Sequence, residues 1–389
     1  MPALLALTAS GFIGYSALFP VAPMWAVRGG ANEAGAGWVN GVLMLATILT
    51  QPSVPKLLNR FGAGRVLAAG LVLLNSPALL HLFSDHLTWI LTLSTIRGLG
   101  FGILTVTGSA AVANLVAPAR HGAAIGVYGA SIAVPQLLLL PAGPWLADVA
   151  GFWLVFAVAT LPVVMISAAP RLARALREQE SERGHDAPGS ATEESDPAKT
   201  GRYRTLARGL VPPMVILLGV TLAGGALITF TPQMSTSTAA TTGGLTLLTA
   251  TAALSRWRLG AFADRYGATA FLVPLIMCTV AGLVLAAVSV ADPQSTRIGA
   301  LLLGMTLVGV AYGGLQNLTL LLSLASVRRK EYNTASAVWN IGFDSGTGVG
   351  SVLVGTLAAG LSFPIALIAA AGASLATLPV AMLQRRRFR

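Results

Sequence analysis

The chain has few charged residues and a single cysteine. Of its 389 residues, 10% are Asp, Glu, Lys or Arg, whereas soluble domains carry roughly 25%. Most of the surface therefore cannot be solvated by water, which excludes an ordinary soluble domain. The one cysteine, Cys278, lies in an apolar run, so the chain can form neither an internal disulfide nor a cysteine-ligated metal site.

Catalytic motifs are also missing. The sequence has no HExxH metal motif, no GxSxG nucleophile elbow and no GxxxxGKS/T phosphate loop. It has four histidines, and none has a partner at metal-ligand spacing; His81 and His86, five residues apart, are interpreted as a chance pairing. We therefore expect neither enzymatic activity, nor a bound metal, nor a cofactor.

Hydrophobic residues make up 54% of the chain and occur in long runs separated by short polar breaks. A helix needs about 20 apolar residues to cross a bilayer, and a helix satisfies all its backbone polar groups within one segment. The sequence therefore predicts an all-α membrane protein with twelve transmembrane helices. Prolines inside the runs, such as Pro52 and Pro135, are expected to bend them. The predicted spans are 3–27, 36–57, 65–83, 88–116, 122–147, 151–170, 208–230, 242–263, 269–290, 297–324, 334–360 and 363–383.

Positive charge gathers on one side of the predicted membrane. If the N-terminus is cytoplasmic, 22 of the 25 Lys and Arg residues fall in cytoplasmic loops and tails. The positive-inside rule accepts this orientation and rejects its inverse. We therefore expect a multi-pass protein of the cytoplasmic (inner) membrane with both termini in the cytoplasm. These loop residues account for the net charge of +11, and nucleic acid is not expected as a partner.

The predicted spans form two sets of six. A polar stretch, 171–207, separates an N-terminal bundle, 1–170, from a C-terminal bundle, 208–389, and is expected to be a solvated cytoplasmic linker. The run Asn59-Arg60-Phe61-Gly62-Ala63 after the second span recurs as Asp264-Arg265-Tyr266-Gly267-Ala268 after the eighth, 205 residues later. The same motif at the same place predicts two pseudo-symmetric six-helix bundles, related by an axis along the membrane normal.

These loop motifs resemble those of the major facilitator superfamily. The run from Gly260 to Gly267 is similar to the loop signature of that family. The first-half copy, from Pro55 to Gly62, departs from this signature. Pro55 replaces the first glycine, and Asn59 replaces the aspartate. In the fourth span, Arg97 followed by Gly98-Leu99-Gly100-Phe101-Gly102 is also similar to the family pattern. The resemblance covers essentially the whole chain.

The fifth span resembles the motif of the family's exporters. Gly143-Pro144-Trp145-Leu146, followed by Gly151-Phe152, is similar to that motif, although Leu139-Leu140 stands where a Gly-Pro pair is usual. The family likeness implies that spans 1, 4, 7 and 10 line a central cavity. It also implies that the two bundles rock to expose this cavity to each side in turn.

The likeness further implies a conformational latch on the cytoplasmic side. A loop carboxylate can accept hydrogen bonds from a neighbouring helix N-terminus and so favour one conformer. Asn59 keeps the hydrogen bonding without the charge, so the first-half latch is expected to be weaker. The two arginines are equally consistent with positive-inside anchors. The latch residues are Asn59, Arg60, Asp264 and Arg265.

Two ionisable side chains lie deep in the predicted spans, Arg97 in the fourth and Asp344 in the eleventh. A charge there costs roughly 2.5–3.5 kcal/mol on insertion scales, so it indicates a partner or a task. Low dielectric favours a neutral acid and a nearby cation favours a carboxylate, so Asp344 is predicted to bind and release a coupling proton. Arg97 is predicted to bind substrate or to stabilise ionised Asp344, since a guanidinium does not deprotonate in proteins. A fixed salt bridge or a hydrogen-bonded packing role is the alternative for both.

Aromatic and amide residues in the spans are candidates for substrate binding. Such side chains suit an amphipathic organic substrate, although they also serve as packing or interface anchors. The candidates, with Arg97, are Tyr15, Phe19, Arg97, Gln136, Tyr312, Gln316, Asn317 and Asn340. Around Asp344, the glycines at 342, 346 and 350 recur one turn apart and are expected to pack against another helix, with Asp344 pointing away from them.

With no nucleotide site, an ion or solute gradient must supply the energy for transport. The sequence favours a secondary active transporter that exports a small drug-like or secondary-metabolite molecule by alternating access, coupled to protons. Its expected partners are the small-molecule substrate and the lipid bilayer, and a monomer is expected. Two alternatives stay open. One is a uniporter or importer of a polar metabolite, and the other is a lipid-handling or accessory membrane protein.

Overall fold

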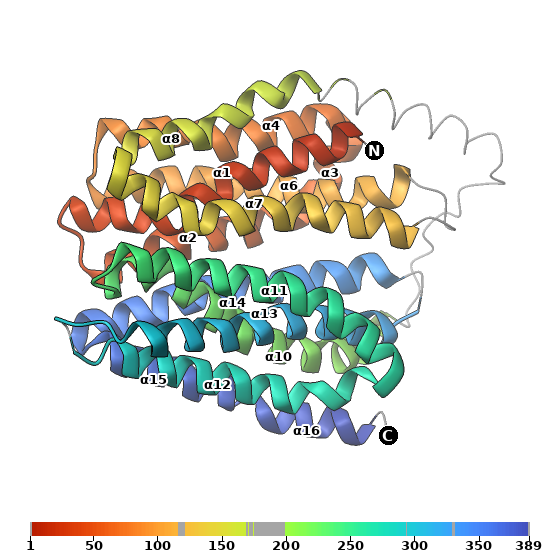
Figure 1. The fold of residues 1–389 in the computed structure, drawn as a ribbon. Helices are drawn as coiled ribbons and strands as arrows, with labels where there is room; N and C mark the ends of the chain where they lie inside the picture. The colour runs from red at the N-terminus through yellow and green to blue at the C-terminus, as the bar shows by residue number, and fades with distance from the viewer. Residues whose placement is uncertain are drawn as a thin grey trace.

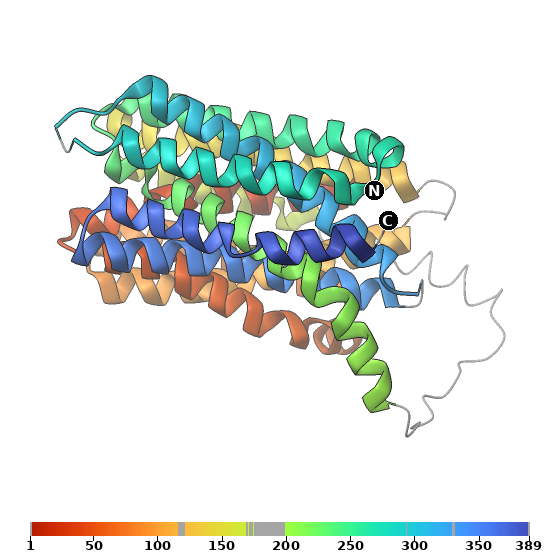
Figure 2. The ribbon, with the colours of Figure 1, turned by 90° about the horizontal axis from the view of Figure 1, so that it is seen from below.

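The computed structural model describes residues 2–115, 121–168, 170, 174, 199–292, 294–328 and 331–387. Over these residues the chain is helical, and the only strand-like pairing is an isolated bridge between Asp292 and Ser295. The helices lie side by side in two stacked halves, with both chain ends at the same end of the molecule (Figure 1, Figure 2). We call this end the terminal end and the opposite one the far end. The predicted linker, 171–207, lies largely outside the described residues.

The N-terminal half begins with α1, which runs towards the far end. Asn32 caps the start of α2, because its side chain accepts a hydrogen bond from the backbone N–H of Gly35 at 3.0 Å. The elements of this half are α1 (Pro2–Arg28), α2 (Glu33–Thr50), η1 (Gln51–Ser53), α3 (Val54–Phe61), α4 (Ala63–Asn75), α5 (Pro77–Leu80), η2 (His81–Phe83), α6 (Leu87–Leu115), α7 (His121–Ala150), α8 (Phe152–Thr160) and η4 (Leu161–Ala168).

The C-terminal half repeats this course. Ser237 caps α11 by accepting from the backbone N–H of Ala240 at 3.3 Å. The elements of this half are α10 (Lys199–Met234), α11 (Thr238–Tyr266), η5 (Ala268–Phe271), α12 (Leu272–Ser289), α13 (Ile298–Ala325), α14 (Tyr332–Gly360), α15 (Phe363–Leu375) and α16 (Leu378–Arg387).

Nine helical stretches among the described residues are long and apolar enough to cross a bilayer. A tenth, Phe152–Ser167, is apolar but shorter. The helices α11 and α14 have 29 residues each and are richer in Gly, Thr and Ser. Both lie between the two halves, where polar and small side chains are shielded from lipid. Together these helices confirm the predicted layout of twelve spans in two bundles.

Prolines interrupt several spans. The second span changes to a 3-10 turn at η1, which contains Pro52, and the third breaks before Pro77. The sixth span loses its α-helical geometry at η4, which contains Pro162. Proline lacks a backbone N–H and clashes with the preceding turn, so the helix cannot continue unchanged. Pro135, by contrast, lies inside the unbroken α7.

The two halves meet mainly through three helix pairs, α2 with α14, α7 with α11 and α1 with α10. Glycines allow the closest of these approaches, since a Cβ at Gly37 of α2 would collide with the carbonyl oxygen of Ser351 on α14. Towards the terminal end the contact between α2 and α14 stops, because α3 packs on α4 and α6 of its own half. The halves are therefore joined most closely towards the far end.

Candidate functional site

Asp344 lies near the middle of α14, with 3% of its surface exposed. Its carboxyl group accepts a hydrogen bond from the Nε2 of Gln51 at 2.6 Å. Gln51 begins η1, at the point where Pro52 ends the regular geometry of α2. A buried acid of the C-terminal half is thus bonded to a buried amide of the N-terminal half.

The glycine ladder of α14 explains the direction of Asp344. A Cβ at Gly342, Gly346 or Gly350 would collide with residues of α10, the last with the carbonyl of Leu222. The prediction that these glycines pack against another helix is therefore confirmed. Because they hold one face of α14 against α10, Asp344 faces α2 on the other side.

An aromatic cluster lies close by in the N-terminal half. The rings of Tyr15 and Phe101 are stacked, with centroids 4.2 Å apart and planes 5° from parallel. Phe12 meets both rings edge to face, and Phe19 lies 5.2 Å from Tyr15. All four side chains are buried. Tyr15 and Phe19 were predicted to belong to the site. Phe101 was not, although it follows Arg97 by one helical turn in the fourth-span motif.

The C-terminal half contributes a second aromatic cluster. The ring of Phe343 lies 6.1 Å from Tyr312 and 5.8 Å from Trp339, whose indole N–H donates to the Thr319 hydroxyl at 3.0 Å. Gln316, one turn from Tyr312, is buried, and its amide nitrogen has no partner among the described residues. The Gln316 side chain nevertheless lies close enough to the Tyr312 hydroxyl to interact with it.

The structure brings three predicted residues together across the halves. Tyr15 of α1, Tyr312 of α13 and Asp344 of α14 lie close enough to interact electrostatically with one another. Arg256 of α11 also interacts with Tyr312 and was missed, because its sequence position suggested a loop anchor. An acid, two phenols, several aromatic rings and amides therefore meet between the bundles.

Arg97, unlike Asp344, makes its hydrogen bonds within one half. It is 1% exposed and donates hydrogen bonds to two backbone carbonyl oxygens, from Nε to Leu74 at 3.2 Å and from a terminal nitrogen to Gly14 at 3.3 Å. These bonds tie α6 to α4 and α1 within the N-terminal half. Over the described residues, Asp344 and Arg97 are not bonded to each other, and Tyr15 interacts with both.

The remaining substrate candidates are more scattered. The Asn317 amide donates to the carbonyl of Arg256 at 2.9 Å, which ties α13 to α11. The Asn340 amide donates to Ser336 of its own helix at 3.0 Å. Gln136 is half-buried on α7. Their role in binding stays a prediction.

The predicted latch residues form matching turns in the two halves. Gly62 and Gly267 end α3 and α11 with φ of 78° and 83°, a region that glycine adopts without strain. Just before them, Arg60 lies over Phe61 at 5.2 Å and Arg265 over Tyr266 at 5.3 Å. Asn59 and Asp264 are exposed. The repeat thus extends to the turn geometry, while the latch itself stays a prediction.

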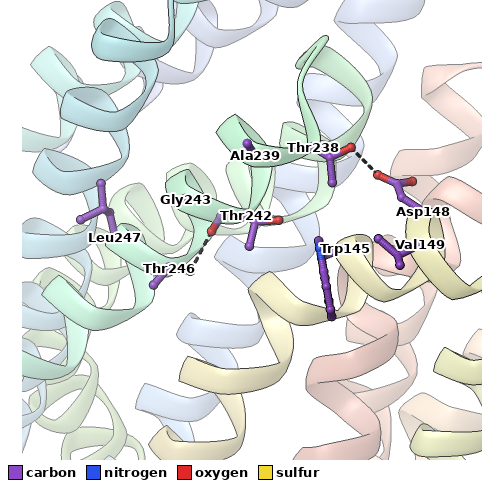
Figure 3. Close-up of a pocket in the computed structure, with 9 residues that line it drawn as sticks. All are labelled: Trp145, Asp148, Val149, Thr238, Ala239, Thr242, Gly243, Thr246 and Leu247. Atoms are coloured by element: carbon purple, nitrogen blue, oxygen red, sulfur yellow. Dashed lines mark hydrogen bonds between the residues drawn. The ribbon is translucent and has the colours of Figure 1, made fainter.

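A groove lies between α7 and α11 near the far end, with a volume of about 680 Å³ (Figure 3). Asp148 closes one end of it by accepting a hydrogen bond from the Thr238 hydroxyl at 2.7 Å. The exposed side chains of Trp145 and Val149 line one wall, and Thr242 and Thr246 the other. A second hollow of about 400 Å³ continues along the same helices past Leu138 and Pro141. The described residues contain no group of three His, Cys, Asp or Glu that could hold a metal ion.

Two similar helical halves that enclose a buried polar and aromatic site define a polytopic membrane transport protein. The sequence profile described as Major Facilitator Superfamily matches residues 4–323. The chain therefore belongs to this superfamily, and its family and fold are those of transporters. No curated protein matches the chain in sequence.

Solved transporters share the fold. A bacterial homologue of the human lysosomal transporter Spinster, in an inward-facing and unoccupied conformation, superposes with a TM-score of 0.72 and 13% identity, covering 99% of this chain and 96% of that one. The nucleoside transporter NupG superposes with a TM-score of 0.67 and 13% identity, covering 98% of each chain. At such identities the likeness concerns the fold alone.

Proposed function

We propose that the protein is a proton-coupled secondary transporter that exports an aromatic, amphipathic small molecule across the cytoplasmic membrane. The observation that carries this proposal is Asp344, a buried acid at the contact between the halves, bonded to Gln51 and close to Tyr15 and Tyr312. An acid in this place can change its protonation as the halves move, and the aromatic rings beside it can hold a flat organic molecule.

The fifth span supports export as the direction. Gly143 of the exporter-like motif lies against α1, where a Cβ would approach the carbonyl oxygen of Ala17 to 2.8 Å. The motif therefore serves to pack α7 tightly on α1, the helix that carries Tyr15. Movement of α7 against α11 of the other half would then be passed directly to the aromatic cluster.

The test uses purified protein in proteoliposomes with an imposed pH gradient and ethidium, a flat aromatic cation, as the probe. We expect gradient-driven ethidium transport that Asp344→Asn reduces to the level of protein-free vesicles, because the amide cannot release a proton. Ethidium exchange without a gradient is expected to persist in this variant. Asp292→Asn, which changes an exposed loop acid, is the matched control and keeps full activity.

Two results would contradict the proposal. Gradient-driven transport that survives Asp344→Asn removes the proton-coupling role of this acid. Uptake of a nucleoside such as uridine that does not depend on the pH gradient favours the uniporter alternative; NupG, which shares the fold, is a nucleoside transporter.

The groove between α7 and α11 favours a second candidate function, the handling of a lipid or another amphiphile. The apolar side chains of Trp145, Val149 and Leu138 are exposed along α7 and line the groove, while threonine hydroxyls and Asp148 supply polar groups at its side and end (Figure 3). A molecule with one polar end and one apolar chain matches this lining.

This candidate is tested by measuring the exchange of fluorescently labelled phospholipid between leaflets in the same vesicles. Lipid handling predicts exchange that Trp145→Ala slows. Trp153→Ala, which removes an exposed tryptophan on α8, is the control. Exchange no faster than in protein-free vesicles eliminates this candidate.

A further inference from the structure

At the contact between Gln51 and Asp344, one of the two polar atoms of the Gln51 amide is hydrogen-bonded and the other is not. Gln51 is 5% exposed, and its Nε2 donates to Asp344 at 2.6 Å. Its Oε1 is buried and has no hydrogen-bond partner among the described residues. A buried amide oxygen without a partner is costly, about as much as a lost hydrogen bond, so it calls for an explanation.

This contact also holds a particular place in the interface. Among the described residues, hydrogen bonds join side chains of the two halves at three levels: Asp148 with Thr238, Asn40 with Thr229, and Gln51 with Asp344. The last of them lies furthest towards the terminal end, where α3 leaves α14 and packs on its own half. The Gln51–Asp344 pair therefore stands at the edge where the two halves part.

An amide is suited to both protonation states of an acid. A carboxylate only accepts hydrogen bonds, whereas a carboxylic acid also donates one. The Gln51 Nε2 can donate to either form, and its Oε1 can accept from the protonated acid alone. Protonation of Asp344 would therefore satisfy the orphan oxygen and remove the buried charge at the same time.

We propose that Gln51 is a positioning residue that ties α2 to α14 while Asp344 is protonated and releases it when the acid ionises. This inference rests on the proposed proton-coupling role of Asp344. Transfer of a carboxylate out of water is costly, so ionised Asp344 favours a conformer in which water reaches it. Acid thus favours the conformer of this structure, with the pair closed, and alkali favours its separation.

In the part of the chain that the structure describes, few other titratable groups face the Gln51–Asp344 pair. Tyr15 of α1 and Tyr312 of α13 interact with Asp344, while Arg97 and Arg256 face these two phenols. Among the helices packed on α14, α15 has no titratable residue. The titratable residue of α2 is Glu33, which lies in the first turn of that helix, at the far end. The charged residues of α10 all precede Gly209. Asp344 is therefore the carboxyl group that can titrate at this contact.

The test needs no substrate. Spin labels are placed at Lys56→Cys on α3 and Thr334→Cys on α14, both exposed near the terminal end, in full-length Cys278→Ser protein in nanodiscs. Pulsed electron paramagnetic resonance measures the distance between them from about pH 5 to about pH 9. We expect alkaline pH to increase the longer-distance component by about tenfold, and Gln51→Met to reduce this pH response to about twofold or less.

Two control variants separate the effect of the Gln51–Asp344 hydrogen bond from a general change in packing between the halves. Thr50→Val removes a hydroxyl whose one hydrogen bond among the described residues is to the carbonyl of Ala46 on its own helix, and this variant is expected to keep the full pH response. Asn40→Leu removes the neutral cross-half bond to Thr229 and is expected to shift the populations equally at every pH. If Gln51→Met does not fold, Gln51→Asn, whose amide is one methylene too short, replaces it.

The outcomes are distinguishable. A pH response that Asp344→Asn abolishes but Gln51→Met leaves intact overturns the inference and spares the proposed function. A response that survives Asp344→Asn overturns both, because another group then titrates.

Discussion

At the residue scale, Arg97 shows how a cation is held inside a membrane-spanning bundle. Its guanidinium donates to the carbonyl oxygens of Leu74 and Gly14, which already belong to helices, so it joins three helices without a carboxylate. A buried charge keeps this position only because its donors are used. The arrangement makes Arg97 a structural tie of the N-terminal half.

Arg97→Gln is therefore expected to lower the stability of the protein by about 1–3 kcal/mol, the usual cost of breaking buried hydrogen bonds. The measurement is the thermal unfolding midpoint in detergent. Arg60→Gln, at an exposed arginine, is the control and is expected to change stability by less than about 0.5 kcal/mol. Equal midpoints for the two variants would show that the carbonyl contacts of Arg97 contribute little.

At the element scale, glycines on α2 and α14 allow two different close approaches, one between the halves and one within the C-terminal half. Gly37 lets α2 approach α14 across the halves, against the carbonyl of Ser351, whereas Gly350 lets α14 approach α10 within one half, against the carbonyl of Leu222. The same substitution at the two sites therefore separates contact between the halves from packing inside one of them.

Gly37→Ala is expected to disfavour closure at the far end by about 1–3 kcal/mol, because the added methyl collides with backbone that cannot move aside. The measurement is thiol-reagent access to a cysteine placed near the far end, such as Trp38→Cys in the Cys278→Ser background. Gly350→Ala is expected to lower the unfolding midpoint and to leave this access unchanged. Identical access in both variants would contradict the assignment.

At the scale of the whole molecule, transport by alternating access requires the halves to part at the far end as well. Asp148 of α7 and Thr238 of α11 face each other there across the groove (Figure 3). A short cross-linker between Asp148→Cys and Thr238→Cys is expected to stop ethidium transport, and reductive cleavage of the linker to restore it. The same linker between Thr251→Cys and Thr306→Cys, within one half, is expected to leave transport unchanged. Undiminished transport in the first pair would exclude opening along α7 and α11.

Much of the fold could be predicted because lipid leaves few choices. Apolar runs of about 20 residues must be helices, and the repeated turn at Gly62 and Gly267 placed the two halves in register. The breaks at Pro77 and Pro162 were less visible, since Pro135 occupies a similar apolar run without interrupting its helix. Whether a proline breaks a span depends on neighbouring helices that can satisfy the freed carbonyl.

For the site, the sequence by itself determined that Asp344 and Arg97 would be buried, because each lies in the middle of a segment that must cross the bilayer. Only the tertiary structure decided their partners. Gln51 lies 293 positions from Asp344 in the chain, and nothing local to either residue indicates which helix it faces. Hydropathy fixes how deep a side chain lies, whereas the packing of one half on the other fixes what it meets there.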